Sequence, residues 1–157
     1  MTRVLVGAAT IMSIMVFMTT LSLHAQRRDV SRINAVKSVR CAFTTMATGN
    51  WRDGAAVVET KQTKMALGFD SVNTDDGTAR MLGDFGASDI IVRLSEGTLH
   101  FVQSFREGPL YTTTIFPYEN RPGYFRAVHT RHEYTEVSVP GFTSRPEQYY
   151  GECEIGN

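Results

Sequence analysis

Hydrophobic and polar residues alternate along a series of short segments that begins at Val39, and turn residues separate one segment from the next. Alternation with a period of two places apolar side chains on one face of a β-strand. It is clear in 99–105, where Leu99, Phe101 and Phe105 fall on one side. The candidate strands cover residues 39–46, 55–62, 65–72, 78–83, 89–94, 99–105, 110–118 and 124–135.

The short connections between these segments predict an antiparallel meander of about eight strands, in one all-β domain over residues 39–157. Eight strands suffice to close into a barrel, although a β-sandwich fits nearly as well. The C-terminal tail contains Pro140, Gly141 and Pro146, so we expect it to cross an open end or edge of the sheet without adding a regular strand. Residues 26–38 are polar with a loose helical spacing, and they predict a flexible segment or one short helix.

Residues 1–25 have the layout of a secretory signal peptide. Arg3 is the only charge before the uncharged run from Val4 to Leu23, and small Ala25 follows as a cleavage position. A retained anchor is the alternative, since about 20 residues are long enough to span a bilayer. Gly, Thr and Ser residues dilute the run, so cleavage is the favoured interpretation, and it leaves no membrane span. The mature protein is then expected outside the cytoplasm, in the periplasm or beyond the cell, where disulfides persist.

The two cysteines of the chain, Cys41 and Cys153, are both in the predicted mature part. In an oxidising compartment two cysteines most simply pair with each other, and they lack the Cys-x-x-Cys spacing of a redox centre. We therefore expect a structural disulfide. Such a bond requires the first part of the domain to contact the last.

Charge and length narrow the possible functions. Removing the 25-residue leader from 157 residues leaves 132, which suits one domain with one core. The leader holds one base and no acid, so 15 Lys and Arg face 16 Asp and Glu in the mature chain. Because the charges balance and no basic block is present, the sequence predicts no positive electrostatic potential that would attract nucleic acid or anionic lipid.

The densest group of ionisable residues runs from His129 to Glu133. In a strand His129, Arg131 and Glu133 share one face, and His132 lies on the other. The two histidines therefore do not bind one metal, and we predict no metal site. Either face could point inward. The His129 face would then form a pocket for a polar or anionic group, or else these charges lie on the solvated face of an edge strand.

A small ligand of apolar or amphipathic character is the first functional hypothesis. Alternation selects a set of residues that would line its site, and a shift of register by one residue would exchange the faces. The set is Phe101, Phe105, Phe116, Phe125, His129 and Arg131. The alternative is a structural or protein-interaction domain at the cell envelope, without a pocket, that exposes an aromatic patch including Tyr149 and Tyr150.

The sequence indicates no cofactor and favours a protein that is not an enzyme. It contains no Gly-x-Ser-x-Gly, His-Glu-x-x-His or phosphate-loop motif. A hydrolase with His129 or His132 as its base ranks last, because no nucleophile motif accompanies either residue. The acidic residues between Asp70 and Asp84 fail the calcium-loop spacing, since Gly77 stands where an oxygen ligand is needed. A turn with solvated carboxylates is the better interpretation.

Two parts of the chain resemble segments of known protein groups. Gly49-Asn50-Trp51, near the start of an all-β chain, resembles the lipocalin signature, which implies a ligand-binding barrel whose tryptophan packs in the core at the closed end. The Thr-Asp-Tyr element and C-terminal helix of lipocalins are not matched. Cys41-Ala-Phe and Tyr150-Gly-Glu-Cys153 are similar to segments of uncharacterised secreted bacterial proteins. That second likeness implies an exported protein and transfers no functional residues.

Overall fold

The computed structural model of the protein describes residues 32–83, 86–106, 108–135 and 144–156. This part of the chain is built from antiparallel strands that follow one another in the order of the sequence. Their bounds are β1 Ser38–Arg52, β2 Ala55–Asn73, β3 Thr78–Gly83, β4 Gly86–Ser95, β5 Thr98–Ser104, β6 Leu110–Arg121, β7 Tyr124–His132 and β8 Glu147–Gly156. The predicted meander of eight antiparallel strands is confirmed.

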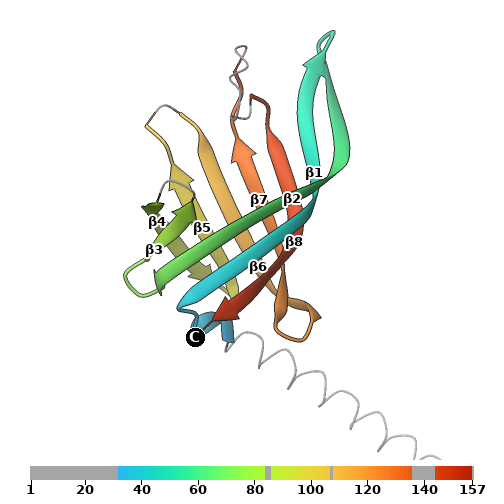
Figure 1. Ribbon diagram of the computed structural model, residues 1–157. Helices are drawn as coiled ribbons and strands as arrows, with labels where there is room; N and C mark the ends of the chain where they lie inside the picture. The colour runs from blue at the N-terminus through green and yellow to red at the C-terminus, as the bar shows by residue number, and fades with distance from the viewer. Residues whose placement is uncertain (1–31, 84–85, 107, 136–143, 157) are drawn as a thin grey trace, which may run out of the picture.

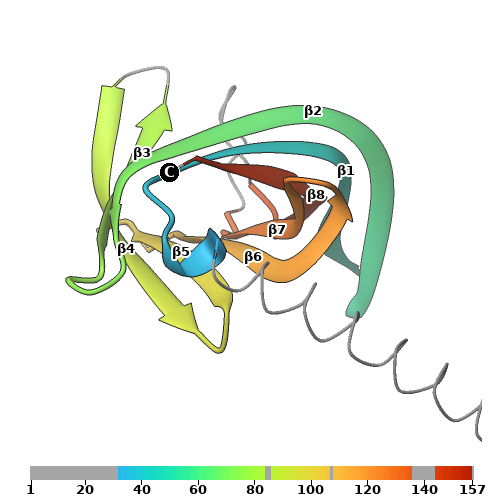
Figure 2. The same cartoon turned by 90° about the horizontal axis from the view of Figure 1, so that it is seen from below.

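The sheet closes on itself, because β1 pairs with β2 on one side and with β8 on the other. Figure 1 shows the resulting cup from the side, with the long β1–β2 hairpin rising above one end. We call this end the open end. At the other end lies the C-terminus, and Figure 2, a view from below, shows the short segment before β1 lying across the ring there. We call this the closed end. The arrangement is a closed barrel and not a two-sheet sandwich.

Two elements differ from their predictions. The segments 55–62 and 65–72 form one long strand, β2, without a break. The C-terminal tail, expected to cross an end or edge of the sheet, instead supplies β8, the strand that closes the barrel. The reason is position: Pro146 immediately precedes β8 and does not interrupt it. From Glu147 onward the tail has strand alternation, with Tyr149, Cys153 and Ile155 buried.

Cys41 and Cys153 form a disulfide bond, as predicted. They face each other directly across β1 and β8, so the bond fastens the two strands that close the ring. Next to this bond, the barrel is filled by large buried side chains. They include Phe43, Phe69, Phe101, Phe125, Leu99 and Ile115, which are 0–2% exposed.

Residues 32–34 form a short helical turn before β1, which is one of the two predictions for this region. The side chain of Ile33 in this turn is fully buried, and that of Val36, just after the turn, is nearly fully buried. Both side chains therefore add to the core at the closed end. No helix within the described ranges is long and apolar enough to cross a membrane. The predicted signal peptide, residues 1–25, lies outside the described residues.

Candidate functional site

The inward face of β7 carries the polar residues that the sequence singled out. Phe125, Ala127 and His129 are each buried, and the residues between them are exposed or half-buried. The interior interpretation of the His129 face is therefore correct. His132 lies on the outer face and is exposed. The two histidines point to opposite sides of the sheet, as the alternation predicted.

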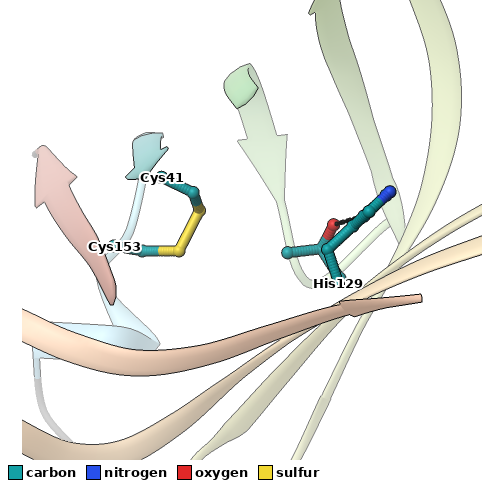
Figure 3. The surroundings of a disulfide bond; sticks show 4 residues. Cys41, His129 and Cys153 are labelled. Atoms are coloured by element: carbon teal, nitrogen blue, oxygen red, sulfur yellow. Dashed lines mark hydrogen bonds between the residues drawn. A yellow bond between two sulfur atoms is a disulfide. The ribbon is translucent and has the colours of Figure 1, made fainter. Parts of the chain in front are cut away.

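His129 is 2% exposed and lies at the boundary between the apolar core and the open end. Its Nδ1 atom is 2.9 Å from the hydroxyl oxygen of Thr113 on β6. Its ring contacts those of Phe43, Tyr111 and Tyr149, with centroids 5.8 to 6.1 Å apart. Figure 3 shows the His129 side chain directed into the barrel, on the same side of the sheet as the disulfide.

Burial, and then the charge of Arg131, lower the pKa of His129 from its usual 6.5 to about 4. The imidazole is therefore neutral at physiological pH. A neutral imidazole offers one donor and one acceptor. Thr113 engages one of these two positions, which leaves Nε2 for another group.

Arg131 forms the next layer toward the open end. Its guanidinium carbon lies 5.3 Å from the ring centre of Tyr111 and 5.4 Å from that of Tyr149. The nearest carboxylate oxygen, on Glu147, is 3.9 Å away, which is a loose ion pair. One terminal nitrogen also approaches the sulfur of Met65 on β2, at 3.6 Å. The cation is thus held chiefly by aromatic rings.

Two tyrosine hydroxyls at this level donate to carboxylates. Tyr111 donates to Glu133 at 2.9 Å, and Tyr149 donates to Glu147 at 2.5 Å. Burial, together with these hydrogen bonds, raises the pKa of Tyr111 to about 12 and raises the pKa of Tyr149 as well. Both phenols therefore stay protonated. One basic residue, Arg131, and two acidic residues, Glu133 and Glu147, belong to this layer, so its formal charge is one negative unit.

Three buried side-chain atoms near the open end have no hydrogen-bond partner in the part of the chain that the structure describes. They are Gln103 Oε1, His129 Nε2 and Arg131 Nε. Gln103 and His129 both line an internal cavity of about 10 Å³, whose other walls include Phe69, Phe101 and Tyr111. A space of this size holds about one water molecule or one polar ligand atom.

A wider hollow of about 220 Å³ opens at the same end of the barrel. It lies where the β1–β2 hairpin meets the end of β7 and the start of β8, and its lining includes Val58, His132 and Pro146. Arg131 and Glu147 line it as well. The Arg131 layer therefore connects the interior of the barrel with this outer hollow.

The structure brings together four of the six predicted ligand-site residues. Phe101 stacks on Phe69 with centroids 4.1 Å apart and lines the small cavity. Phe105, beyond the end of β5, packs edge-on against Tyr111 at 4.9 Å. Together with His129 and Arg131, these phenylalanines lie toward the open end of the interior.

The other two predicted residues lie elsewhere. Phe125 is fully buried, pairs with Cys153 across β7 and β8, and contacts Arg32 of the helical turn at the closed end. Phe116 follows the buried Ile115, so it lies on the opposite face of β6 and is half-buried. The placement of Phe116 on the interior face is therefore a correction. In β6 the inward residues are Thr113 and Ile115. The aromatic side chain of Phe116 suggested the opposite face, and this is why the prediction failed.

Tyr111, Tyr149, Gln103 and Glu147 belong to the site, but sequence reasoning did not select them. Alternation gave a usable signal for two of them, since Gln103 shares a face with Phe101 and Tyr111 shares one with Thr113. Tyr149 was expected in an exposed patch, and this expectation is wrong: it is 6% exposed and points inward. Its neighbour Tyr150 is exposed, as expected. The error follows from treating the tail as irregular.

Trp51 is 54% exposed near the tip of the β1–β2 hairpin, so it does not take the core position that the lipocalin resemblance implied. Its ring packs edge-on against that of Tyr134, with centroids 5.5 Å apart.

In the acidic turn, the Asn73 side chain accepts hydrogen bonds from the backbone of Asp75 and Asp76. Hydrogen bonds from a nearby backbone to an Asn side chain are typical of a turn, which agrees with the turn predicted for this segment. Within the described ranges, no three His, Cys, Asp or Glu side chains gather as a metal site.

Comparison with known proteins adds no relative: no protein-family model, curated protein or solved structure matches the chain.

Proposed function

We propose that this protein is a small extracytoplasmic binding module that holds a partly apolar ligand in the open end of its barrel. The observation that carries the proposal is the set of three unpartnered buried atoms on two adjoining interior levels: Gln103 Oε1, His129 Nε2 and Arg131 Nε. Burying a polar group without a partner costs about 1–3 kcal/mol. Three such groups side by side are the pattern of a site prepared for a ligand.

The chemistry of these atoms defines the ligand. Arg131 Nε–H only donates, so the ligand must supply an acceptor. Gln103 Oε1 only accepts, so the ligand must also supply a donor. Because one cation, Arg131, faces two carboxylates, Glu133 and Glu147, a neutral ligand group fits better than a further anion. A hydroxyl or primary amide on an aromatic or aliphatic body meets these conditions. Its polar group suits the small cavity beside Gln103 and His129, and its apolar body suits the wider hollow next to Val58 and Pro146.

The proposed location rests on two observations. The leader at residues 1–25 has the layout of a signal peptide, and the disulfide between Cys41 and Cys153 is compatible with an oxidising compartment. One measurement tests location and ligand together: the mass of the protein isolated from its exported fraction, taken under native and then denaturing conditions. Loss of residues 1–25 in the denatured mass and a dissociable adduct in the native mass are the expected results.

A matched pair of probes tests the ligand class directly. 2-Naphthol carries a neutral hydroxyl that donates and accepts, and 2-naphthoate presents a carboxylate on the same ring system. We expect calorimetric titration to show tighter binding of 2-naphthol at pH 7. Failure of both probes to bind at millimolar concentration, with no native adduct, would favour the alternative of an interaction domain without a pocket.

Gln103→Leu separates a binding role from a structural one. Leucine removes the unpartnered acceptor, so the free energy of unfolding should stay the same or increase, whereas 2-naphthol should bind about tenfold more weakly. The exposed Gln62 on β2 provides the control, because Gln62→Leu makes the same change outside the barrel. A structural role for Gln103 predicts the opposite pattern: lower stability and unchanged affinity for the probe.

A further inference from the structure

The long strand β2 has an edge that no described strand covers. It pairs with β3 only from Gly68 to Asn73, whereas its pairing with β1 begins at Ala55. The backbone groups that point away from β1 between Ala55 and Leu67 are therefore unpaired within the described ranges. The side chains of this stretch are exposed or half-buried throughout, and Val58 is 68% exposed. An uncovered edge of this length is a template for another strand.

Charge on this edge limits how it can pair. Glu59, Lys61 and Lys64 are its charged residues. Glu59 and Lys61 are two residues apart, so they share a face of the sheet, and Lys64 lies on the other face. Arg52 on β1 contacts Glu59 at 2.6 Å and so orients its carboxylate on that shared face. Charged residues on an edge normally oppose pairing between molecules, unless the register places opposite charges together.

We propose that two copies of this protein associate through this edge, as antiparallel β2 strands related by a twofold axis at Thr60. A twofold axis perpendicular to the sheet keeps each residue on its own face, so only partners of equal parity oppose each other. An axis at Thr60 places Glu59 of each copy opposite Lys61 of the other. Shifting the axis by one residue places Glu59 opposite Glu59, or Lys61 opposite Lys61.

The length of the edge agrees with this register. An axis at Thr60 pairs Ala55 with Met65, so the paired stretch runs from the first residue of β2 almost to Leu67, where the uncovered edge ends. The exposed Val58 then lies opposite Gln62 and loses contact with water. Repulsion between two Glu59 or two Lys61 side chains disfavours the neighbouring registers, so the register with its axis at Thr60 is favoured over them. The contact is a single strand pair and forms a reversible dimer, not an obligate one.

Charge exchange tests the register. Sedimentation velocity of the oxidised protein, purified from the exported fraction, should show a monomer–dimer equilibrium between about 1 μM and about 1 mM. Glu59→Lys and Lys61→Glu each place two like-charge pairs in the contact, so each should raise the dimer dissociation constant at least about tenfold. The double variant restores both pairs with reversed sign and should dimerise about as well as the unchanged protein.

Lys64→Glu is the matched control, because it makes the same charge change on the other face, opposite Ala56 of the partner copy. It should alter the dissociation constant little. A monomer at every concentration would overturn the proposal, and so would a double variant that stays as weak as the single ones. Equal effects of Lys64→Glu and Lys61→Glu would show a general charge effect, which also contradicts the register. Thermal unfolding of each variant confirms that it is folded.

Discussion

At the scale of single residues, two interior side chains, His129 and Arg131, each combine engaged atoms with one atom that has no described partner. His129 meets Thr113 through Nδ1 while Nε2 has no described partner. Arg131 contacts Glu147 and two tyrosine rings, yet its Nε is unpartnered. Carboxylates accept hydrogen bonds from Tyr111 and Tyr149, which fixes the rings around the cation. The interior level is therefore rigid where it contacts protein and unsatisfied where a ligand would approach.

The buried His129 makes stability depend on pH. Its pKa is about 4 when folded and near 6.5 when unfolded, so the unfolded chain binds the extra proton first. The contribution of neutral His129 to the free energy of unfolding is fully present above pH 6.5. It is lost as the pH falls from 6.5 to 4, and the loss is on the order of 3 kcal/mol. In urea titrations, His129→Gln should remove this part of the pH dependence, and His132→Gln on the outer face should retain it. An unchanged slope in His129→Gln would contradict the assignment.

At the scale of elements, a β-bulge in β1 shapes its contact with β8. The register of β1 shifts between Phe43 and Thr45 against both neighbours, and Gly151 of β8 lies opposite this shift. A Cβ atom at Gly151 would overlap the carbonyl oxygen of Ala42 and lie 2.7 Å from Phe43 Cα. The backbones approach so closely that only glycine fits there.

Gly151→Ala should therefore lower the free energy of unfolding by about 1–3 kcal/mol, because the backbone of β1 must move. Gly49→Ala is the control: it is also in a strand, and its nearest neighbour would be the carbonyl oxygen of Pro146 at 3.8 Å. Urea unfolding midpoints give the comparison. Equal midpoints for the two variants would show that β1 yields without cost.

Strand alternation predicted the inward face of β5 and separated the two faces of β7, because each strand has a regular period of two bounded by turn residues. It left open which face of β7 points inward. It failed where another signal intervened. In β2 the run of polar residues from Glu59 to Lys64 interrupted the apolar pattern, since this half extends beyond the barrel and has no core to face. In β8 the prolines upstream masked a regular strand. The candidate site was found in part. Gln103 and Tyr111 lie in predicted strands whose alternation was a usable signal, whereas Tyr149 lies in β8, which was not predicted as a strand.

At the scale of the whole molecule, one covalent bond holds the closure of the ring. Cys41 and Cys153 are 112 residues apart in sequence and directly opposite each other across β1 and β8. Cross-linking residues so distant restricts the unfolded chain strongly, and loops of about this length give up to about 4.7 kcal/mol. The disulfide is therefore a major part of the stability of so small a domain.

Reduction should accordingly lower the urea midpoint substantially, with a loss in the free energy of unfolding of about 3–5 kcal/mol. The paired variant Cys41→Ser with Cys153→Ser should show the lower midpoint from the start and no response to reductant. If reductant shifts the midpoint of that variant too, the effect does not come from the bond. A wild-type midpoint that is insensitive to reductant would show that hydrophobic packing alone sets the stability.

The pairing of β1 with β8 also has a consequence for biogenesis. Among the described strands, β8, which completes the barrel, is synthesised last, and its partner β1 is synthesised first. Contacts between segments so distant form slowly, because the intervening chain must first be ordered. Until β8 is available the ring cannot close, so we expect the barrel to stay open while β8 is being made. Closure of the barrel and formation of the Cys41–Cys153 bond should then coincide, because both need β1 and β8 side by side.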